Sequence, residues 1–201
     1  KGEIKFFINL IKENAETFDV EKRLAPHLSE LVRLVGAKRI MATPSLVRSL
    51  LHHDSLVDPA EKALLFDVMT LLKMRDEIVS SSVANREWHD HKNFGNWILM
   101  AAQQEESNDR PLLRHLIAFA KIRDERFQKA LLSILKINTL TLGETLSLLN
   151  SPWGNSPIAA DIIESLSKDS KNRLNLLRAL LITDQKIVEP RALEMVQALL
   201  A

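Results

Sequence analysis

The sequence predicts an all-α fold of about ten short amphipathic helices, arranged as an irregular, α-solenoid-like helical array or as a multi-helix bundle. Apolar residues recur at intervals of three and four along most of the chain, which places them on one face of a helix. Glycine is rare, with five among 201 residues. No run of alternating apolar and polar residues between turn signals indicates a strand.

The predicted helices follow one another along the whole chain, and each has an apolar stripe that we expect to be buried against a neighbour. The stripes, in chain order, are Ile4, Phe7, Ile8 and Ile11; Leu46, Val47, Leu50 and Leu51; Leu64, Leu65, Val68, Met69 and Leu72; Phe94, Trp97, Ile98 and Ala101; Leu112, Leu113, Leu116, Ile117 and Ala120; Phe127, Leu131, Ile134 and Leu135; Ile158, Ala159, Ile162, Ile163 and Leu166; Leu174, Leu177 and Leu181; and Leu193, Val196, Leu199 and Leu200.

Capping residues mark several helix starts. A side chain that can cap a helix precedes a proline in three dipeptides, which are Thr43-Pro44, Asp58-Pro59 and Ser156-Pro157. Proline is favoured in the first helical turn because its missing N–H has no partner there in any case.

Two further signals refine the helix ends. Glu61 follows Asp58 by three residues, and Glu144 follows Thr141 by three, so both pairs fit a capping box. Gly36 stands where a helix that ends near Val35 would take a left-handed residue.

One segment interrupts the helical rhythm. Residues 79–96 are rich in Ser and Asn and predict a long loop or a poorly formed helix. We therefore expect one helical domain over 1–201, or two helical halves, 1–80 and 95–201, joined by 79–96. Residues 105–109 are a second candidate boundary. The chain begins with Lys1 rather than Met and runs directly into a helix, so we expect it to be a fragment of a larger protein.

A short stretch resembles a repeat family. Gly154-Asn155-Ser156-Pro157-Ile158 resembles the opening of an ankyrin repeat, which typically reads Gly-x-Thr-Pro-Leu-His. The likeness covers five residues, and Ala159 stands where the family has His. Residues 109–113 resemble the same opening less closely. The two prolines, Pro111 and Pro157, are separated by 46 positions, a spacing closer to that of HEAT repeats. The resemblance implies a stacked helical array.

Composition restricts the compartment and the partners. There is no Cys, which fits a reducing compartment, and no apolar run is long enough to span a bilayer, so we expect a cytoplasmic protein, with a location peripheral to a membrane as the alternative. Lys and Arg number 27 against 26 Asp and Glu. Without a dense basic stripe, nucleic acid is not an expected partner.

Catalytic or metal chemistry has few candidates. His89 and His91 flank Asp90 and could supply metal ligands, but no second cluster supports them, so a solvated or capping role is favoured. No phosphate loop, nucleophile elbow or zinc helix is found. The sequence predicts no catalytic residue, no cofactor and no metal. An unfamiliar helical enzyme would be indicated by His89, His91 or His115 beside a carboxylate in a pocket.

Two sets of residues are candidates for interaction. The first is basic. Arg123, Arg126, Lys129 and Lys136 recur at spacings that keep them on one side of a predicted helix, and Lys168, Lys171, Arg173 and Arg178 add charge in the C-terminal third. Such faces can meet an anionic lipid headgroup or an acidic partner, although Glu125 is placed to pair with Lys129. The second set is Trp88 and Trp153, which lie in connecting segments. Each side chain either packs a loop against the core or is exposed to bind a partner.

These observations favour one function over two alternatives. The first is a non-catalytic helical scaffold or protein–protein interaction domain of a larger intracellular protein, with another protein as its partner. The second is a peripheral-membrane or phosphoinositide-binding module that uses the basic helix faces. The third is an unfamiliar all-helical enzyme.

Overall fold

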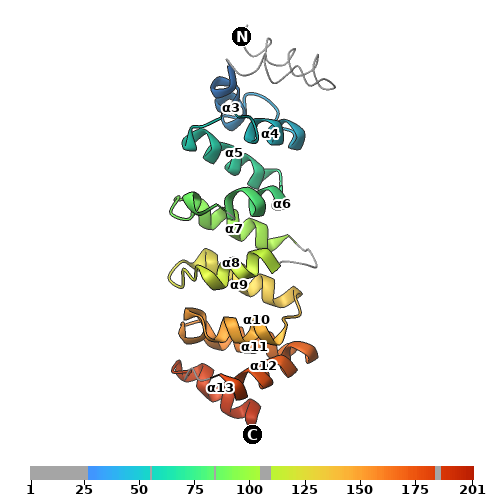
Figure 1. Cartoon of the computed structure of the whole chain (residues 1–201), viewed down its shortest axis with the longest axis vertical. Coiled ribbons are helices and arrows are strands. Elements are labelled where there is room, and N and C mark those ends of the chain that lie inside the picture. Colours follow the sequence, from blue (N-terminus) through green and yellow to red (C-terminus); the bar gives the residue numbers. More distant parts are fainter. Residues whose placement is uncertain (1–26, 55, 84, 105–109, 184–186) are drawn as a thin grey trace. The chain divides into compact units, whose positions relative to one another are not determined.

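The computed structural model describes residues 27–54, 56–83, 85–104, 110–183 and 187–201, and within them it shows eleven α-helices and no strand (Figure 1). This confirms the all-α prediction. The predicted stripe from Ile4 to Ile11 and the boundary at 105–109 lie outside these residues. None of the helices described is both long enough and apolar enough to cross a bilayer.

The chain divides into two compact units, of which the first ends at Ile78 and the second begins at Val79. In the first unit, helix α5 packs against the other three helices. The helices are α3 (Leu28–Gly36), α4 (Pro44–Leu51), α5 (Pro59–Leu71) and α6 (Arg75–Ile78). The buried apolar core includes Leu31, Val32, Val47, Leu50, Leu65, Phe66, Met69 and Ile78.

Local capping chemistry determines where α4 and α5 begin. Thr43 accepts a hydrogen bond from the backbone N–H of Leu46, and Asp58 accepts one from Ala60 at 2.8 Å, as predicted from the Thr-Pro and Asp-Pro pairs. The predicted capping box at Asp58 is wrong in its second half. Glu61 is buried and accepts a hydrogen bond from the Ser29 hydroxyl of α3 at 3.1 Å, because α3 packs directly over the start of α5.

The end of α3 differs from the prediction. Gly36 is the last helical residue and has a negative φ, whereas Lys38, two residues later, adopts the left-handed conformation with φ 57°. The chain reverses two residues later than expected because the backbone N–H groups of Ala37 and Lys38 still bond to α3 carbonyls.

The second unit contains seven α-helices, one short π-helix and two 3-10 helices among the described residues. In chain order these elements are the π-helix η2 (Val79–Val83), the 3-10 helix η3 (Arg86–Trp88), α7 (Phe94–Gln103), α8 (Arg110–Ala118), α9 (Glu125–Ile137), α10 (Leu142–Leu149), the 3-10 helix η4 (Pro152–Asn155), α11 (Ala159–Lys168), α12 (Ser170–Ile182) and α13 (Pro190–Leu200).

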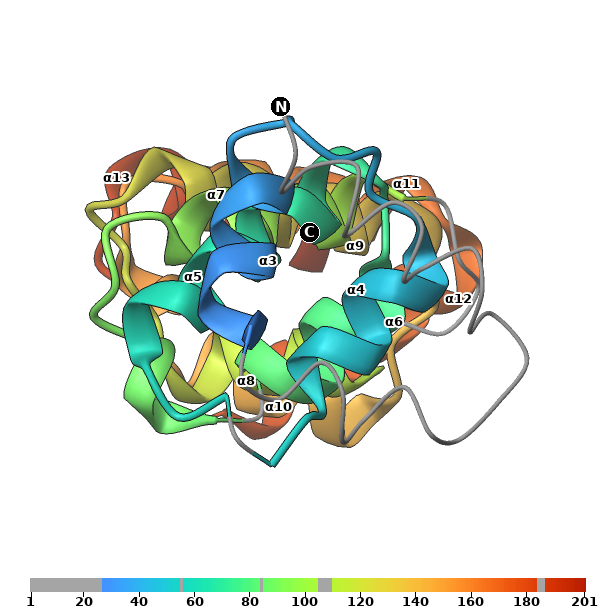
Figure 2. The ribbon, with the colours of Figure 1, turned by 90° about the horizontal axis from the view of Figure 1, so that it is seen from above.

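Helices of the second unit pack on their second neighbours in the chain. α7 packs on α9, α9 on α11 and α11 on α13, while α8 packs on α10 and α10 on α12. The result is an odd-numbered row and an even-numbered row of helices. The labels of α7, α9, α11 and α13 lie together in one half of Figure 2, and those of α8 and α10 lie in the other.

Buried apolar residues of the odd row recur at a nearly constant interval. Ile98 of α7, Leu131 of α9 and Ile163 of α11 are all buried and stand 33 and 32 positions apart. The spacing of 46 between Pro111 and Pro157 compares unlike positions, because Pro111 lies in an even-row helix and Pro157 precedes an odd-row one.

Two predicted helix starts in this unit have different outcomes. Thr141 and Glu144 form the predicted capping box in full at the start of α10. Ser156 does not cap α11, which begins only at Ala159. Its hydroxyl instead donates a hydrogen bond to the Trp153 carbonyl at 2.8 Å, because the η4 turn already occupies the preceding residues.

The segment 79–96 that was predicted to be irregular is made of short turns. It contains η2, η3 and the first residues of α7, which begins at Phe94. Whether it joins two independent halves at 80 and 95 stays a prediction.

Two glycines give a matched pair of stability variants. A Cβ on Gly154 would lie 1.9 Å from the Leu149 carbonyl oxygen, whereas a Cβ on Gly143, an exposed residue of α10, would meet nothing within 4 Å. We expect Gly154→Ala to lower the free energy of unfolding by about 1–3 kcal/mol, since backbone must move. Gly143→Ala should raise it by about 0.4–1 kcal/mol. Urea unfolding followed by circular dichroism measures both, and equal effects of the two substitutions would contradict this account.

Candidate functional site

The connections that lead from even-row to odd-row helices are bonded to one another and form one edge of the second unit. We call this the loop edge, and it comprises residues 85–93, 119–124 and 150–158 with the described residues of 183–189. Lys121 donates a hydrogen bond to the His89 carbonyl, and Val188 donates one to the Asn155 side chain at 2.9 Å. These bonds join residues that lie 32 and 33 positions apart. The connection 85–93 is therefore bonded to 119–124, and 150–158 is bonded to the described residues of 183–189.

Arg126 is the best-connected side chain of this edge. Its guanidinium donates to both carboxylate oxygens of Asp124, at 3.0 and 2.8 Å, and to the Lys92 carbonyl at 3.2 Å and the Asn96 side chain at 3.3 Å. It also lies directly against Gly95, where a Cβ would come within 2.6 Å of its Nε. The hydrogen bond from Arg126 lowers the pKa of the Asp124 carboxyl. Arg126 thus ties the start of α9 to the start of α7.

A shallow depression lies on the loop edge between α8 and α9. It has a volume of about 650 Å³ and is lined by the six consecutive residues Ala120 to Glu125. Its lining combines two cations, Lys121 and Arg123, with two carboxylates, Asp124 and Glu125. Ala120 and Ile122 add apolar surface. A site of this composition can contact a partner that presents both charge signs.

A cluster of histidine and phenylalanine rings lies beside the depression. The ring of His89 is 4.7 Å from that of His115 and 4.5 Å from that of Phe119. The Lys121 ammonium lies 5.9 Å from the Phe94 ring centre. This packing attaches residues 119–121 to the interior.

His115 is the unusual member of the ring cluster. It is buried, and its Nε2 has no hydrogen-bond partner among the residues that the structure describes. Burial, with the nearby His89 and Lys121, lowers its pKa to about 4. The imidazole is therefore neutral near pH 7 and serves as an aromatic core residue.

The histidines considered as metal ligands are occupied by backbone groups. Nε2 of His89 is 3.1 Å from the Val83 carbonyl oxygen, and Nδ1 of His91 accepts a hydrogen bond from the Asn93 N–H at 3.2 Å. Within the described ranges, no three His, Asp or Glu side chains are grouped so that they could hold a metal ion.

Both candidate tryptophans lie inside the second unit. Trp88 is 3% exposed and makes edge contacts with His91 and Trp97. Trp153 is fully buried, and its indole N–H donates to the Leu116 carbonyl at 2.8 Å. In this structure each indole fastens a connecting segment to the core, so neither presents a surface to a partner.

The predicted basic face of α9 separates into bonded and unbonded cations. Lys129 is 3.5 Å from Glu125, the predicted pairing, and Arg126 is engaged as described above. Arg123 was predicted on this helix but lies before it, in the connection that ends at the N-cap residue Asp124. Arg123 and Lys136 are exposed and make no ion pair with a described residue. The four side chains therefore do not form one continuous positive stripe.

The basic residues of the C-terminal third are distributed in a similar way. Lys168 pairs with Glu164 at 2.9 Å, and this hydrogen bond lowers the pKa of the Glu164 carboxyl. Lys171, Arg173 and Arg178 lie on α12, are exposed, and have no ion pair to the described part of the chain. They leave α12 with three free cations.

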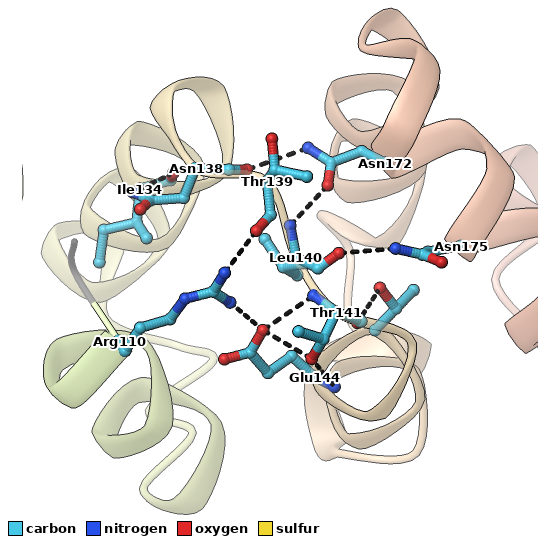
Figure 3. A network of polar contacts seen from close by, with 10 residues as sticks. Arg110, Ile134, Asn138, Thr139, Leu140, Thr141, Glu144, Asn172 and Asn175 are labelled. Carbon is cyan, nitrogen blue, oxygen red and sulfur yellow. Dashed lines mark hydrogen bonds and ion pairs between the residues drawn. The ribbon is translucent and has the colours of Figure 1, made fainter. Parts of the chain in front are cut away.

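A network of polar contacts that the sequence did not indicate joins α9, α10 and α12 (Figure 3). The buried side chain of Asn172 donates to the Asn138 carbonyl at 3.0 Å and accepts from the Leu140 N–H at 2.6 Å. Asn175 donates to the Leu140 carbonyl at 2.8 Å. Arg110 bonds to both Glu144 and the Thr139 carbonyl. The α9–α10 connection is thereby held from both sides.

The partners in this network lie about one interlayer interval apart in the sequence. Arg110 and Glu144 lie 34 positions apart, and Leu140 and Asn172 lie 32 apart. Apolar residues of the odd row recur at the same interval, so aligning the chain with itself at an offset of 32 or 33 brings equivalent positions together. A periodicity of three and four residues identifies single helices, but it does not detect this longer interval.

Comparison with family models, curated proteins and solved structures finds no match to this chain.

Asn172 offers a test of the polar network. Asn172→Leu would leave the Asn138 carbonyl and the Leu140 N–H buried without a partner, and each such group costs about 1–3 kcal/mol. Asn172→Asp keeps only the acceptor and adds a charge beside a carbonyl. We expect both substitutions to lower the free energy of unfolding by at least about 1 kcal/mol in urea titrations. Gln197→Leu, at an exposed position of α13, is the control, and an Asn172→Leu effect no larger than that of the control would contradict the network's role.

His115 makes stability depend on pH. Its pKa is lowered from 6.5 to about 4 in the native state. The unfolded chain therefore binds the proton first as pH falls. Stability from this group is complete above pH 6.5 and is lost between pH 6.5 and about 4, by at most about 3 kcal/mol. Urea unfolding at pH 7.0, 5.5 and 4.5 should show this decline.

Substitution of His115 separates its contribution from those of other groups. His115→Phe should flatten the decline between pH 6.5 and 4, while a substitution at exposed His52, to Gln, should leave it intact. Loss from Asp124, whose pKa is lowered below 3.8, falls at lower pH and does not overlap. An unchanged slope in His115→Phe would show that another group is responsible.

Proposed function

We propose that this chain is a non-catalytic, repeat-like helical scaffold that binds another protein through the loop edge of its second unit. The observation that carries the proposal is the loop-edge depression of residues 120–125, which presents both charge signs and apolar surface. Binding residues are often found on loops that a rigid framework holds in place.

The repeat-like character is supported by the spacing of equivalent contacts. Buried odd-row residues recur every 32 or 33 positions, and hydrogen bonds between layers span 30 to 37 positions. Ankyrin repeats have a period of 33 residues and tetratricopeptide repeats one of 34. Arrays of this kind stack each unit on its neighbours and use an extended surface for recognition.

The composition of the depression favours a protein partner. A phosphate-rich ligand needs a surface of one charge sign, whereas here Asp124 and Glu125 stand beside Lys121 and Arg123. Arg123 is the lining residue best suited to bind in this way, because it is exposed and has no ion pair in the described chain. An acidic side chain of the partner would pair with Arg123, while its apolar residues meet Ile122.

Exposed cations outside the depression support a second candidate function, the binding of anionic lipid. Lys136, Lys171, Arg173 and Arg178 are exposed without an ion pair among the residues described, and they could contact an anionic lipid headgroup. Arg126 cannot serve in this role without giving up its bonds to α7 and Asp124. The lipid alternative therefore rests on residues other than those of the depression.

Site-specific photo-crosslinking tests the proposed function. A photoreactive residue at position 123 should crosslink in cells to one partner at near-stoichiometric yield, and the same residue at position 136, on the far end of α9, should not. Arg123→Glu should reduce recovery of that partner about tenfold, a loss of about 1.4 kcal/mol in binding. Lys136→Glu should leave recovery unchanged.

The contrary outcomes are distinct. Equal crosslinking from positions 123 and 136 would count against the loop edge as the binding site. Sedimentation with anionic vesicles that is lost at 0.5 M salt and in Lys171→Glu/Arg178→Glu, but not in Arg123→Glu, would favour the lipid alternative.

A further inference from the structure

The last helix of the odd row carries apolar residues that the described chain covers only in part, with Met195, Val196 and Leu199 half-buried. Ala192, Leu193, Met195, Val196 and Leu199 of α13 stand 33 positions after Ala159, Ala160, Ile162, Ile163 and Leu166 of α11. All five residues of α11 are buried. In α13 only Ala192 is buried, and Leu193 is 41% exposed. α13 therefore repeats the apolar pattern of a helix that is packed on two sides, although it is packed on one.

The last helix of the even row has a corresponding stripe. Leu174 and Leu181 of α12 are 49% and 75% exposed. They lie seven residues apart with Leu177 between them, which places all three on one helix face. Leu176 and Ala179, on the opposite face, are fully buried. α12 and α13 both lie at the end of the second unit that carries the C-terminus (Figure 1), and we call their uncovered apolar surface the end face.

We infer that the end face is a docking site for a further helical layer, a pair of amphipathic helices that pack on α12 and α13 as these pack on α10 and α11. The inference continues an interface that already recurs through the unit, where α9, α11 and α13 each pack on the preceding odd-row helix. It does not depend on the proposed function, because the loop edge and the end face share no residue.

Charge indicates what the docking helices carry besides apolar residues. Successive layers are joined by ion pairs, with Arg110 to Glu144 in the even row and Arg191 to Asp161, at 3.1 Å, in the odd row. Lys171 and Arg178 flank the Leu174 stripe on α12 and have no such partner among the described residues. The helix that covers α12 should therefore place Asp or Glu opposite them.

The spacing of the stripes selects a helical partner over an extended one. An extended segment presents alternate residues 6–7 Å apart and would not follow a stripe with helical spacing. A second copy of the chain would have to present a complementary end face of its own, yet α12 and its flanks are cationic on both copies. A helical layer with carboxylates meets both requirements.

An appended layer tests the inference with the full chain. A second copy of residues 138–168, whose α10 carries Glu144, is joined directly after Ala201, so that its helices can stack on α12 and α13. The sequence has no Cys, so Leu181→Cys supplies a single thiol probe on the end face. We expect alkylation of Cys at position 181 to slow at least tenfold when the layer is appended, and the helical circular dichroism signal to rise with the added residues.

Matched controls distinguish docking from a general effect. Ile137→Cys, on α9 and 43% exposed, should react equally fast with and without the appended layer. An appended layer whose apolar residues are replaced by Ser should give no protection at position 181.

Two results would overturn the inference. One is an appended layer that adds no helical signal and leaves the thiol at position 181 fully reactive. The other is a dimer of the unmodified chain in sedimentation equilibrium that Leu181→Glu dissolves, because the end face would then be occupied by a second copy.

Discussion

The packing of each helix on its second neighbour in the chain is the constraint on which the rest of the second unit depends. Leu131 and Ile163 lie on α9 and α11, each of which packs on an odd-row helix on both sides, so a middle helix of the odd row must be apolar over a wide arc. Each segment of helix, connection, helix and connection must also keep nearly the same length. One inserted residue would rotate the following apolar face by about 100° and expose it. Burial of apolar surface thus sets the interval of 32 or 33 residues.

Short connections between packed helices create a second requirement, which is that their backbone groups find partners. Asn172 bonds to the α9–α10 connection from the next even-row helix, and Lys121 bonds to the His89 carbonyl from the next connection. A buried amide or carbonyl without a hydrogen-bond partner lowers the stability of the fold. These side chains therefore contribute to folding stability. The Lys121 bond also joins two connections of the loop edge, and a surface that is ordered before binding loses little entropy when it binds.

Basic side chains have two roles in the second unit: some form bonds within it, and others are exposed to a partner. The sequence alone does not distinguish the two. Arg126 and Lys168 are used within the unit, the first to join two helices and the second to pair along one. Arg123 and Arg178 remain free in the described chain. Surface ion pairs add little stability, about 0–1 kcal/mol each, but they remove charge from the surface that a partner meets. The free cations, not the total, define what the molecule can attract.

The sequence by itself determined the helical fold, the starts of helices at Thr43, Asp58 and Thr141, and the burial of Trp97. These features follow from the geometry of one helical turn, and the residues that produce them are three or four positions apart. Only the tertiary structure decided that Glu61 bonds to α3, that Ser156 bonds to the η4 turn instead of capping α11, and which cations are free. It also revealed the roles of Asn172 and the end face. In most of these cases the partner lies about thirty residues away, where local periodicity carries no information, and whether a polar group is bonded or free depends on what packs beside it.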